Sequence, residues 1–274
     1  MKDVKVIYYN DELNDEFSKA KIKAKKIDEK YKYIKSPLWN FMSFIFQNIL
    51  SMPLKILYPK IKLRIEYKGK EKLKTYKNKG YFVYVNHTQP FADTMIPSVP
   101  IYPKRNFFIV NPENISIKPF GKIIEMLGAI PVPGSKNAAK NFLDAIEKRI
   151  RNNQSITIYP EAHIWPYYTK IRNFKSVSFK YPVKLDVPVF CMTNTYQAFG
   201  KKKDKAKIVT YIDGPFYANK ELNEKQAKEE LRDKVYNTMV NRSKNSNIDI
   251  VKYVKILDKA KIYEYNKRCG KILK

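Results

Sequence analysis

The sequence predicts an α/β fold in which a mixed, largely parallel sheet is flanked by helices. Short apolar runs typical of strands alternate with longer segments that have helical spacing. Several of the apolar runs end directly before polar residues, as strands do at the ligand-binding edge of such sheets. No repeat, Gly/Ser-rich linker or shift in composition divides the 274 residues. We therefore expect one central domain over residues 60–245, with appendages at 1–59 and 246–274.

The N-terminal appendage contains the one long uncharged segment of the chain. Residues 36–54 read S-P-L-W-N-F-M-S-F-I-F-Q-N-I-L-S-M-P-L, and basic residues flank them. The segment is just long enough to span a bilayer core, but its apolarity is diluted by Asn40, Gln47, Asn48 and Pro53. We expect a helix, or a short helical pair broken at Pro53, that interacts with a membrane by lying in its interface. A buried core helix is the alternative reading of the same pattern.

From residue 60 onward, strand-like and helix-like segments alternate. The expected strands are residues 61–67, 81–85, 106–110, 129–132, 155–159, 187–193 and 207–212. Two segments, 135–152 and 223–242, have the apolar spacing of amphipathic helices, and the second has acids near its start and bases at its end. The final residues, 246–274, are expected to form a basic helical tail. The order of these elements is typical of a sheet built largely from parallel strands.

The formal net charge of +28 predicts attraction to anionic surfaces. Phospholipid headgroups and nucleic acid are the two large anionic candidates. The chain lacks a recognisable basic recognition helix or zinc finger, and its glycines form no phosphate loop. We therefore expect an anionic membrane surface and no nucleic acid as partner. A solvated basic surface without a dedicated partner is the alternative.

The two cysteines, Cys191 and Cys269, are far apart and lie in no metal-ligand spacing. They suggest neither a disulfide framework nor a zinc site, and a reducing cytoplasmic setting fits them. Cys191 lies inside an apolar strand, where we expect it to pack in the core. Residues 1–17 are charged and lack the apolar stretch of a signal peptide. We expect neither a metal nor a cofactor.

The residues best suited to chemistry follow the expected strand at 81–85. His87 is one of only two histidines, and it is followed by T-Q-P-F-A-D, which ends at Asp93. A neutral imidazole can remove a proton from an alcohol, and a nearby carboxylate can fix its tautomer. Gln89 precedes Pro90, so we expect a turn there and a helix that begins near Pro90. This would place Asp93 in the first helical turns, although a structural role for the pair is also open.

Residues 83–93, V-Y-V-N-H-T-Q-P-F-A-D, resemble the Asn-His-four-residues-Asp signature of the glycerolipid acyltransferases, the family of 1-acylglycerol-3-phosphate acyltransferase. Three further segments resemble blocks of that family and follow in its order. They are L-G-A-I-P-V-P at 127–133 after P-F-G, I-Y-P-E at 158–161, and V-P-V-F-C-M at 187–192 after F-K-S. Each block alone is weak, but together they cover residues 60–212 in a spacing that chance seldom produces.

The resemblance implies an acyltransferase that moves a fatty acyl group from an acyl-thioester to the hydroxyl of a lysophospholipid. His87 would be the general base and Asp93 the carboxylate that orients it. The donor would be acyl-CoA or acyl carrier protein, the acceptor lysophosphatidic acid or a related lipid, and no cofactor would be needed. The protein would be peripheral or monotopic on the cytoplasmic face of the cell membrane. The alternatives are a catalytically inactive lipid-binding relative and, on charge alone, a nucleic-acid-binding protein.

The first departure from the family pattern is an extra residue between His87 and Asp93. Five residues separate the two, where the family has four. On a helix, one residue rotates a side chain by about 100°. We expect the Gln89–Pro90 turn to absorb the insertion.

The second departure is a missing arginine. The third block reads E-A-H-I where the family usually has Glu-Gly-Thr-Arg, so Ile164 stands where an arginine would grip an acceptor phosphate. Guanidinium groups bind phosphate in a bidentate way, which makes Arg105 and Arg172 the preferred substitutes. Lys175 is a further candidate.

Two residues of the third block complete the expected substrate-binding set. The resemblance implies that Glu161 would hold the acceptor's polar head, with a strand-end carboxylate paired with a lysine as the alternative. His163 would add a second polar contact. The aromatics Trp165 and Tyr167 would line the lipid entrance, with core packing as the alternative.

Overall fold

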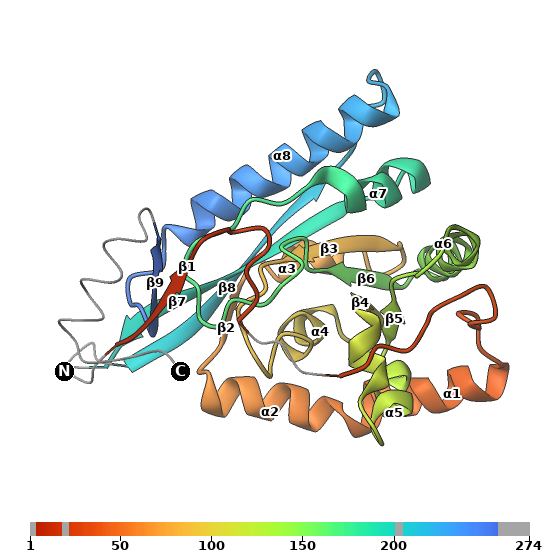
Figure 1. Cartoon of the computed structure of the whole chain (residues 1–274), viewed down its shortest axis with the longest axis horizontal. Coiled ribbons are helices and arrows are strands. Elements are labelled where there is room, and N and C mark those ends of the chain that lie inside the picture. The colour runs from red at the N-terminus through yellow and green to blue at the C-terminus, as the bar shows by residue number, and fades with distance from the viewer. Residues whose placement is uncertain (1–3, 18–21, 201–204, 257–274) are drawn as a thin grey trace.

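The structure is a computed structural model that describes residues 4–17, 22–200 and 205–256. Its centre is a seven-stranded sheet in the order β2-β8-β7-β3-β6-β4-β5 (Figure 1). The strands are β2 (Glu66–Lys68), β3 (Tyr81–Val85), β4 (Asn106–Val110), β5 (Ala129–Pro131), β6 (Ser155–Ile158), β7 (Val189–Phe199) and β8 (Lys205–Phe216). All neighbouring strands run parallel except β7 and β8, which are antiparallel. The predicted α/β fold with a mixed, largely parallel sheet is confirmed.

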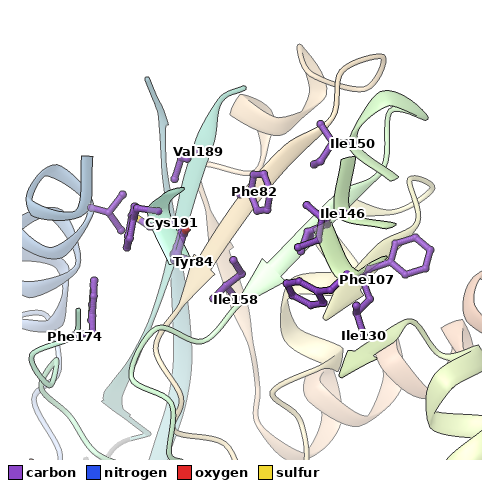
Figure 2. Close-up of a cluster of buried hydrophobic side chains, with 14 of the residues drawn as sticks. Phe82, Tyr84, Phe107, Ile130, Ile146, Ile150, Ile158, Phe174, Val189 and Cys191 are labelled. Carbon is purple, nitrogen blue, oxygen red and sulfur yellow. The ribbon is translucent and has the colours of Figure 1, made fainter. Parts of the chain in front are cut away.

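Helices cover both faces of the central strand β3. One face packs against α6 (Lys136–Arg151), the 3₁₀ helix η3 (Ser176–Phe179), α7 (Lys180–Leu185) and α8 (Glu224–Ser243), and the other against α3 (Glu71–Lys74) and α4 (Met95–Ile101). Phe82 and Tyr84 point to the first face (Figure 2), whereas Tyr81, Val83 and Val85 point to the second. Both sides of the strand are therefore buried, which explains its continuous apolar run.

The two long helices begin where the sequence predicts. The side chain of Ser135 accepts the Ala138 N–H at the start of α6, and that of Asn223 accepts the Gln226 N–H at the start of α8. Each cap satisfies an amide that has no partner within its helix. The helices predicted at 135–152 and 223–242 are thus confirmed.

Two expected elements differ from the structure. Residues 61–67 do not form one strand, because α2 (Met52–Lys62) continues through their start and only Glu66–Lys68 pair with β8. The tail expected to be helical instead contains a strand, β9 (Val251–Lys255), which pairs in parallel with β1 (Lys5–Tyr9). The rest of that tail, residues 257–274, lies outside the described residues, as does Cys269.

The uncharged N-terminal segment forms one long helical stretch along the α4 side of the sheet (Figure 1). It consists of α1 (Pro37–Ile45), the π-helical turn η1 (Phe46–Leu50) and α2. Pro53 does not break the helix, because it lies in the first turn of α2, where no intrahelical N–H bond is lost. By length and composition, residues 37–62 could cross a membrane.

The polarity of this helix is the reverse of that of a core helix. Its buried residues are mostly polar, namely Ser43, Gln47, Asn48 and Lys55, with Met52 and Pro59 as the apolar exceptions. Its exposed side carries large apolar residues, namely Leu38, Phe41, Met42, Phe44, Ile49, Leu50, Leu54, Ile56, Leu57 and Ile61. Burial of its ammonium group lowers the pKa of Lys55 to about 8. The alternative of a buried core helix therefore does not fit, since such a helix buries its apolar side.

Candidate active site

The polar residues that follow β3 and β6 meet at one edge of the sheet. The two strands are parallel neighbours, so their carboxyl ends lie side by side. Asn86 ties the end of β3 to β7: its Nδ2 donates to the Asn194 carbonyl at 3.1 Å, and its Oδ1 accepts the Asn194 N–H at 2.8 Å. His87 is thus placed on a loop whose root is fixed to the neighbouring strand.

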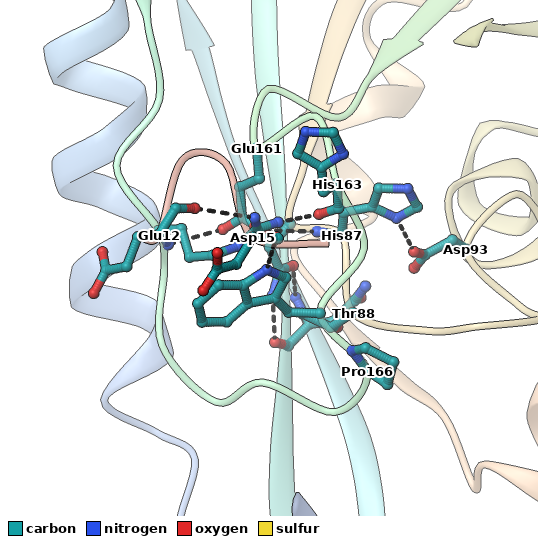
Figure 3. Close-up of polar contacts among 12 residues, drawn as sticks. Glu12, Asp15, His87, Thr88, Asp93, Glu161, His163 and Pro166 are labelled. Atoms are coloured by element: carbon teal, nitrogen blue, oxygen red, sulfur yellow. Dashed lines mark hydrogen bonds and ion pairs between the residues drawn. The ribbon is translucent and has the colours of Figure 1, made fainter. Parts of the chain in front are cut away.

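His87 and Asp93 are in direct contact at this edge (Figure 3). The Nδ1 atom of His87 bonds Oδ2 of Asp93, and Oδ1 of Asp93 accepts the Gln89 N–H at 3.2 Å. Helix α4 begins at Met95, so Asp93 lies in the preceding turn and not in the first helical turns as predicted. The turn at residues 90–94 absorbs the extra residue, as expected. Nε2 remains on the side of the ring away from the carboxylate.

The surroundings of the pair fix both groups. The His87 ring stacks on Tyr159 with 4.5 Å between ring centroids, and the Tyr159 hydroxyl donates to the Asp93 carbonyl. Burial raises the pKa of the Asp93 carboxyl, while the His87 ring and the Gln89 and Thr88 amides act against that rise. Burial, together with the nearby Asp93, raises the pKa of Tyr159 well above its usual value, so it remains a neutral donor. The His87 side chain is still 24% exposed, which leaves its ring open to a ligand.

Glu161 lies behind His87 and is fully engaged by the protein. Its Oε2 accepts the His87 N–H at 3.2 Å, and its Oε1 accepts the Arg172 N–H at 3.0 Å. Nη2 of Arg172 also donates to Oε2 at 3.2 Å. Burial raises the pKa of Glu161, and the Arg172 charge and the two amides counteract it. Glu161 is only 4% exposed and Arg172 is 0% exposed, so the predicted substrate-binding role of these two residues does not fit their placement.

The loop after Glu161 pairs with the loop that carries His87. The Trp165 N–H donates to the His87 carbonyl at 3.0 Å, and the Tyr167 N–H donates to the Thr88 carbonyl at 2.8 Å. Trp165 is completely buried, and its indole N–H donates to the Asp15 carbonyl at 2.9 Å. Its expected place in a lipid entrance is therefore wrong, and the core alternative holds. Tyr167 is partly buried.

The other predicted phosphate-binding residues are not gathered around His87. Arg105 precedes β4 and so lies at the amino edge of the sheet, opposite the His87 edge. It donates to Gln47 Oε1 at 2.9 Å and to Ser43 Oγ at 2.5 Å, so it holds the N-terminal helix. Lys175 is exposed just before η3, and it makes none of the contacts that hold the His87 loop. The expected role of Arg105 beside His87 is thus corrected by its position.

His163 stays close to the candidate site because it follows Glu161 by two residues. Its ring is partly exposed, and its Nδ1 lies 3.8 Å from the Glu16 carboxylate. Its carbonyl accepts a hydrogen bond from Arg172. The side chain is therefore available for a polar contact, as the sequence suggested.

Two supporting residues were missed from the sequence. Tyr159 directly follows β6, so its position after a buried strand was a usable signal. Tyr196 lies within β7, and its hydroxyl donates to Thr88 Oγ1 at 2.9 Å and accepts from Gln89 Nε2 at 2.9 Å. Nothing in the sequence marks Tyr196, because its partners lie more than a hundred residues away. Cys191 is completely buried on β7, which confirms its expected core role.

Comparisons with known proteins give a family model and a similar structure. Residues 64–194 match the family model described as Acyltransferase, a range that includes His87, Asp93, Glu161 and Arg172. No curated protein matches the sequence. The chain is similar to the crystal structure of the 1-acyl-sn-glycerophosphate (LPA) acyltransferase, PlsC, from Thermotoga maritima, with a TM-score of 0.51 and 17% sequence identity. That match covers 77% of this chain and 89% of the other, and at this identity it supports the shared fold.

Proposed function

The chain belongs to the glycerolipid acyltransferase family through residues 64–194, and we propose that it transfers a fatty acyl group from an acyl-thioester to the hydroxyl of a lysophospholipid. The observation that carries this proposal is the contact between His87 Nδ1 and Asp93 at the carboxyl edge of the central strand. A carboxylate on Nδ1 selects the tautomer whose Nε2 is free to accept a proton. The imidazole is therefore arranged as a general base.

The proposed reaction is a direct transfer. Nε2 of His87 removes the proton of the acceptor hydroxyl, and the oxygen attacks the thioester carbonyl to form a tetrahedral intermediate. The carbon–sulfur bond then breaks, and the imidazolium returns its proton to the leaving thiolate. Asp93 stabilises the imidazolium between these steps. Holding both lipids in attack geometry supplies much of the remaining acceleration.

Release of free thiol tests this function. Purified protein is incubated with a lysophospholipid and either acyl-CoA or acyl carrier protein loaded with a fatty acyl group. We expect thiol release from the wild type and its loss in His87→Ala, whereas Glu66→Gln, a change at the exposed ion pair with Lys207 on the edge strand β2, keeps it. Full activity of His87→Ala would remove the imidazole from the mechanism. A wild type that binds lipid without releasing thiol would support the inactive lipid-binding alternative.

The same assay addresses the acceptor. The Arg172 guanidinium donates to Glu161, and the Arg105 guanidinium donates to the N-terminal helix. Neither predicted guanidinium is therefore free to hold an acceptor phosphate. Lysophosphatidic acid and lysophosphatidylcholine are therefore compared as acceptors at equal concentration. A strong preference for lysophosphatidic acid would point to other cations, with Lys175 the first to test.

The N-terminal helix supports a membrane location for this reaction. Its polar side is bonded to the domain: Ser43 donates to the Met126 carbonyl at 2.6 Å and Asn48 to the Pro103 carbonyl at 2.8 Å. Its apolar side is exposed along residues 37–62. We propose that this side lies in the interface of an anionic membrane on the cytoplasmic face, because a helix bonded along the domain surface is not free to span. The net charge of +28 adds attraction to anionic headgroups.

Vesicle flotation tests the membrane proposal. The double variant Phe41→Asp/Leu54→Asp is compared with Val177→Asp, which changes an exposed apolar residue on η3, away from the helix. We expect the double variant to lose about tenfold or more in binding to phosphatidylglycerol vesicles, because burial of one large apolar side chain contributes about 1.5–3 kcal/mol and about 1.4 kcal/mol already corresponds to tenfold. Val177→Asp should bind like the wild type. Equal binding of all three proteins would show that this face does not contact the membrane.

A further inference from the structure

Glu161 and Arg172 form a buried ion pair directly behind His87. We propose that both are positioning residues, which fix the main chain of His87 for acyl transfer and do not contact the substrate. The inference rests on the proposed function, and it assigns these two residues a role different from the substrate contacts expected from the sequence. It follows from three features: how His87 is held, what Arg172 bonds, and where the family's arginine is missing.

The first feature is that both main-chain groups of His87 are held from one loop. Glu161 accepts its N–H at 3.2 Å, and the Trp165 N–H donates to its carbonyl at 3.0 Å. Asp93 then fixes the ring. The imidazole is therefore held at its root by Glu161 and Trp165 and at its Nδ1 by Asp93. A general base must be held in a fixed position, because a displacement of about 1 Å can lower the reaction rate by about 10²-fold. These three contacts meet that requirement.

The second feature is the set of partners of Arg172. Besides Glu161, its guanidinium donates to the carbonyls of His163 and, at 3.3 Å, Glu12. It also lies over the Trp165 ring, with 4.8 Å between the guanidinium carbon and the ring centroid. One side chain thus joins the N-terminal segment, the loop after β6 and the carboxylate behind His87. All its described contacts are with the protein, and none of its surface is left for a ligand.

The Arg172 charge has a chemical role in this arrangement. Both oxygens of Glu161 accept amide hydrogen bonds, which only an ionised carboxylate can do without turning one oxygen into a donor. Burial opposes ionisation and raises the pKa of Glu161. The charge of the adjacent guanidinium is the largest influence that acts against this rise in pKa, so Arg172 keeps Glu161 in the form that holds His87.

The third feature is the missing arginine of the third block. Ile164 stands where the resembled pattern has arginine, while Arg172, later in the same loop, turns inward to Glu161. The positive charge of this region is therefore used inside the protein. A role in gripping an acceptor phosphate would require Arg172 to leave the carboxylate unpaired, which is strongly unfavourable for a buried charge.

Steady-state kinetics distinguish positioning from substrate binding. In Glu161→Gln, which keeps the side-chain size, we expect kcat to fall about 10–100-fold, with the KM for the lysophospholipid within twofold of the wild type. Arg172→Lys, which keeps the charge, should recover part of the rate lost in Arg172→Met. A raised KM with unchanged kcat in Glu161→Gln would show loss of ground-state binding and would overturn the proposal.

The pH dependence of kcat distinguishes a role of the Arg172 charge from a merely structural role, because a loss of packing alone would not shift it. The described titratable groups that face the His87 loop or Glu161 are Asp93, Tyr159, Glu161, Arg172, Tyr168 and Tyr196, with His163 and Glu16 more distant. Without Arg172, Glu161 should take up a proton more readily, so the acidic limb of the kcat profile in Arg172→Met should move to higher pH. The double variant Glu161→Gln/Arg172→Met has no carboxylate to titrate there. Its acidic limb should return to the wild-type position at a low rate, and an unmoved limb in the single variant would refute the charge role.

A second arginine–carboxylate pair provides the control. Asp213 accepts from Arg242 Nε and Nη2, both at 2.8 Å, away from the His87 loop. Asp213→Asn should lower the melting temperature while leaving kcat and the pH profile unchanged. If Arg172→Met does not fold, Glu161→Gln and Arg172→Lys still decide the question. A wild type without thiol release would defeat the proposed function, whereas an active wild type with effects only on KM would defeat this inference alone.

Discussion

Each edge of the central sheet contains an arginine that is at least partly buried, but among the described residues only the one at the carboxyl edge has a carboxylate partner. At the carboxyl edge, Arg172 is completely buried and paired with Glu161. At the amino edge, Arg105 donates to neutral oxygens of the N-terminal helix, namely Asn40 O, Ser43 Oγ and Gln47 Oε1. A second arginine, Arg149, lies nearby, and the two guanidinium carbons are 4.9 and 4.5 Å from the Phe107 ring centroid.

The different partners of Arg172 and Arg105 indicate different structural roles for the two edges. A buried ion pair is tolerated when its geometry is good, and it then fixes the groups around it. Burial lowers the pKa of Arg105 and of Arg149 to about 10 each, and the Arg105 charge adds to the effect at Arg149. Such uncompensated cations are best placed near water or anionic headgroups. The carboxyl edge thus holds the candidate base in place, whereas the amino edge attaches a helix and leaves positive charge beside it.

The largest expected effect separates the two edges by chemistry. Asp93→Asn should lower kcat about 10³–10⁴-fold, because an amide that donates to Nδ1 leaves the proton on Nε2, the nitrogen that must act as base. The matched change at the amino edge is Glu125→Gln, which removes the carboxylate bonded to Lys35 at 2.6 Å. It should leave kcat unchanged. Thiol release under saturating substrate measures both, and comparable losses would mean that the edges are not functionally distinct.

A smaller effect separates them by stability. Arg172→Met leaves Glu161 as a buried unpaired carboxylate and should lower the free energy of unfolding by about 3–5 kcal/mol. Arg105→Met leaves only neutral acceptors unsatisfied and should cost about 1–3 kcal/mol. Urea denaturation of the two variants in parallel gives the comparison. Equal losses would contradict the view that the carboxylate is what makes the carboxyl edge rigid.

The fold was largely predictable because its central strands are buried on both sides. Residues 81–85 are a continuous apolar run and residues 107–110 are another that follows Asn106, and the predicted limits 81–85 and 106–110 are those of β3 and β4. The strand predicted at residues 61–67 was wrong in its first part, because the end of an amphipathic helix also alternates apolar and charged side chains over a short stretch. The pairing of β1 with β9 was not predictable, since it joins the two ends of the described chain and no local pattern records such a contact.

The candidate site was predictable only in its local part. His87 and Asp93 are close in sequence, and a turn is enough to bring them together. The role of Arg172 depends on a loop that folds back behind His87, and a single arginine gives no sign of whether it points inward or outward. Its burial against Glu161 and Trp165 is a property of the tertiary structure alone.

The smallest expected effect compares backbone strain at the two edges. Ala162, next to Glu161, has φ +63°, and Asn153, just before β6 at the amino edge, has φ +58°. A left-handed conformation costs alanine about 1–2 kcal/mol. Glycine avoids this strain, but its greater conformational freedom in the unfolded chain offsets about 0.5–1 kcal/mol of the gain. Ala162→Gly should therefore stabilise the protein by about 0.5 kcal/mol, or about 1–2 °C in melting temperature. Asparagine adopts this conformation more readily, so Asn153→Gly should gain nothing; a larger gain there would place the strain at the amino edge instead of beside the candidate base.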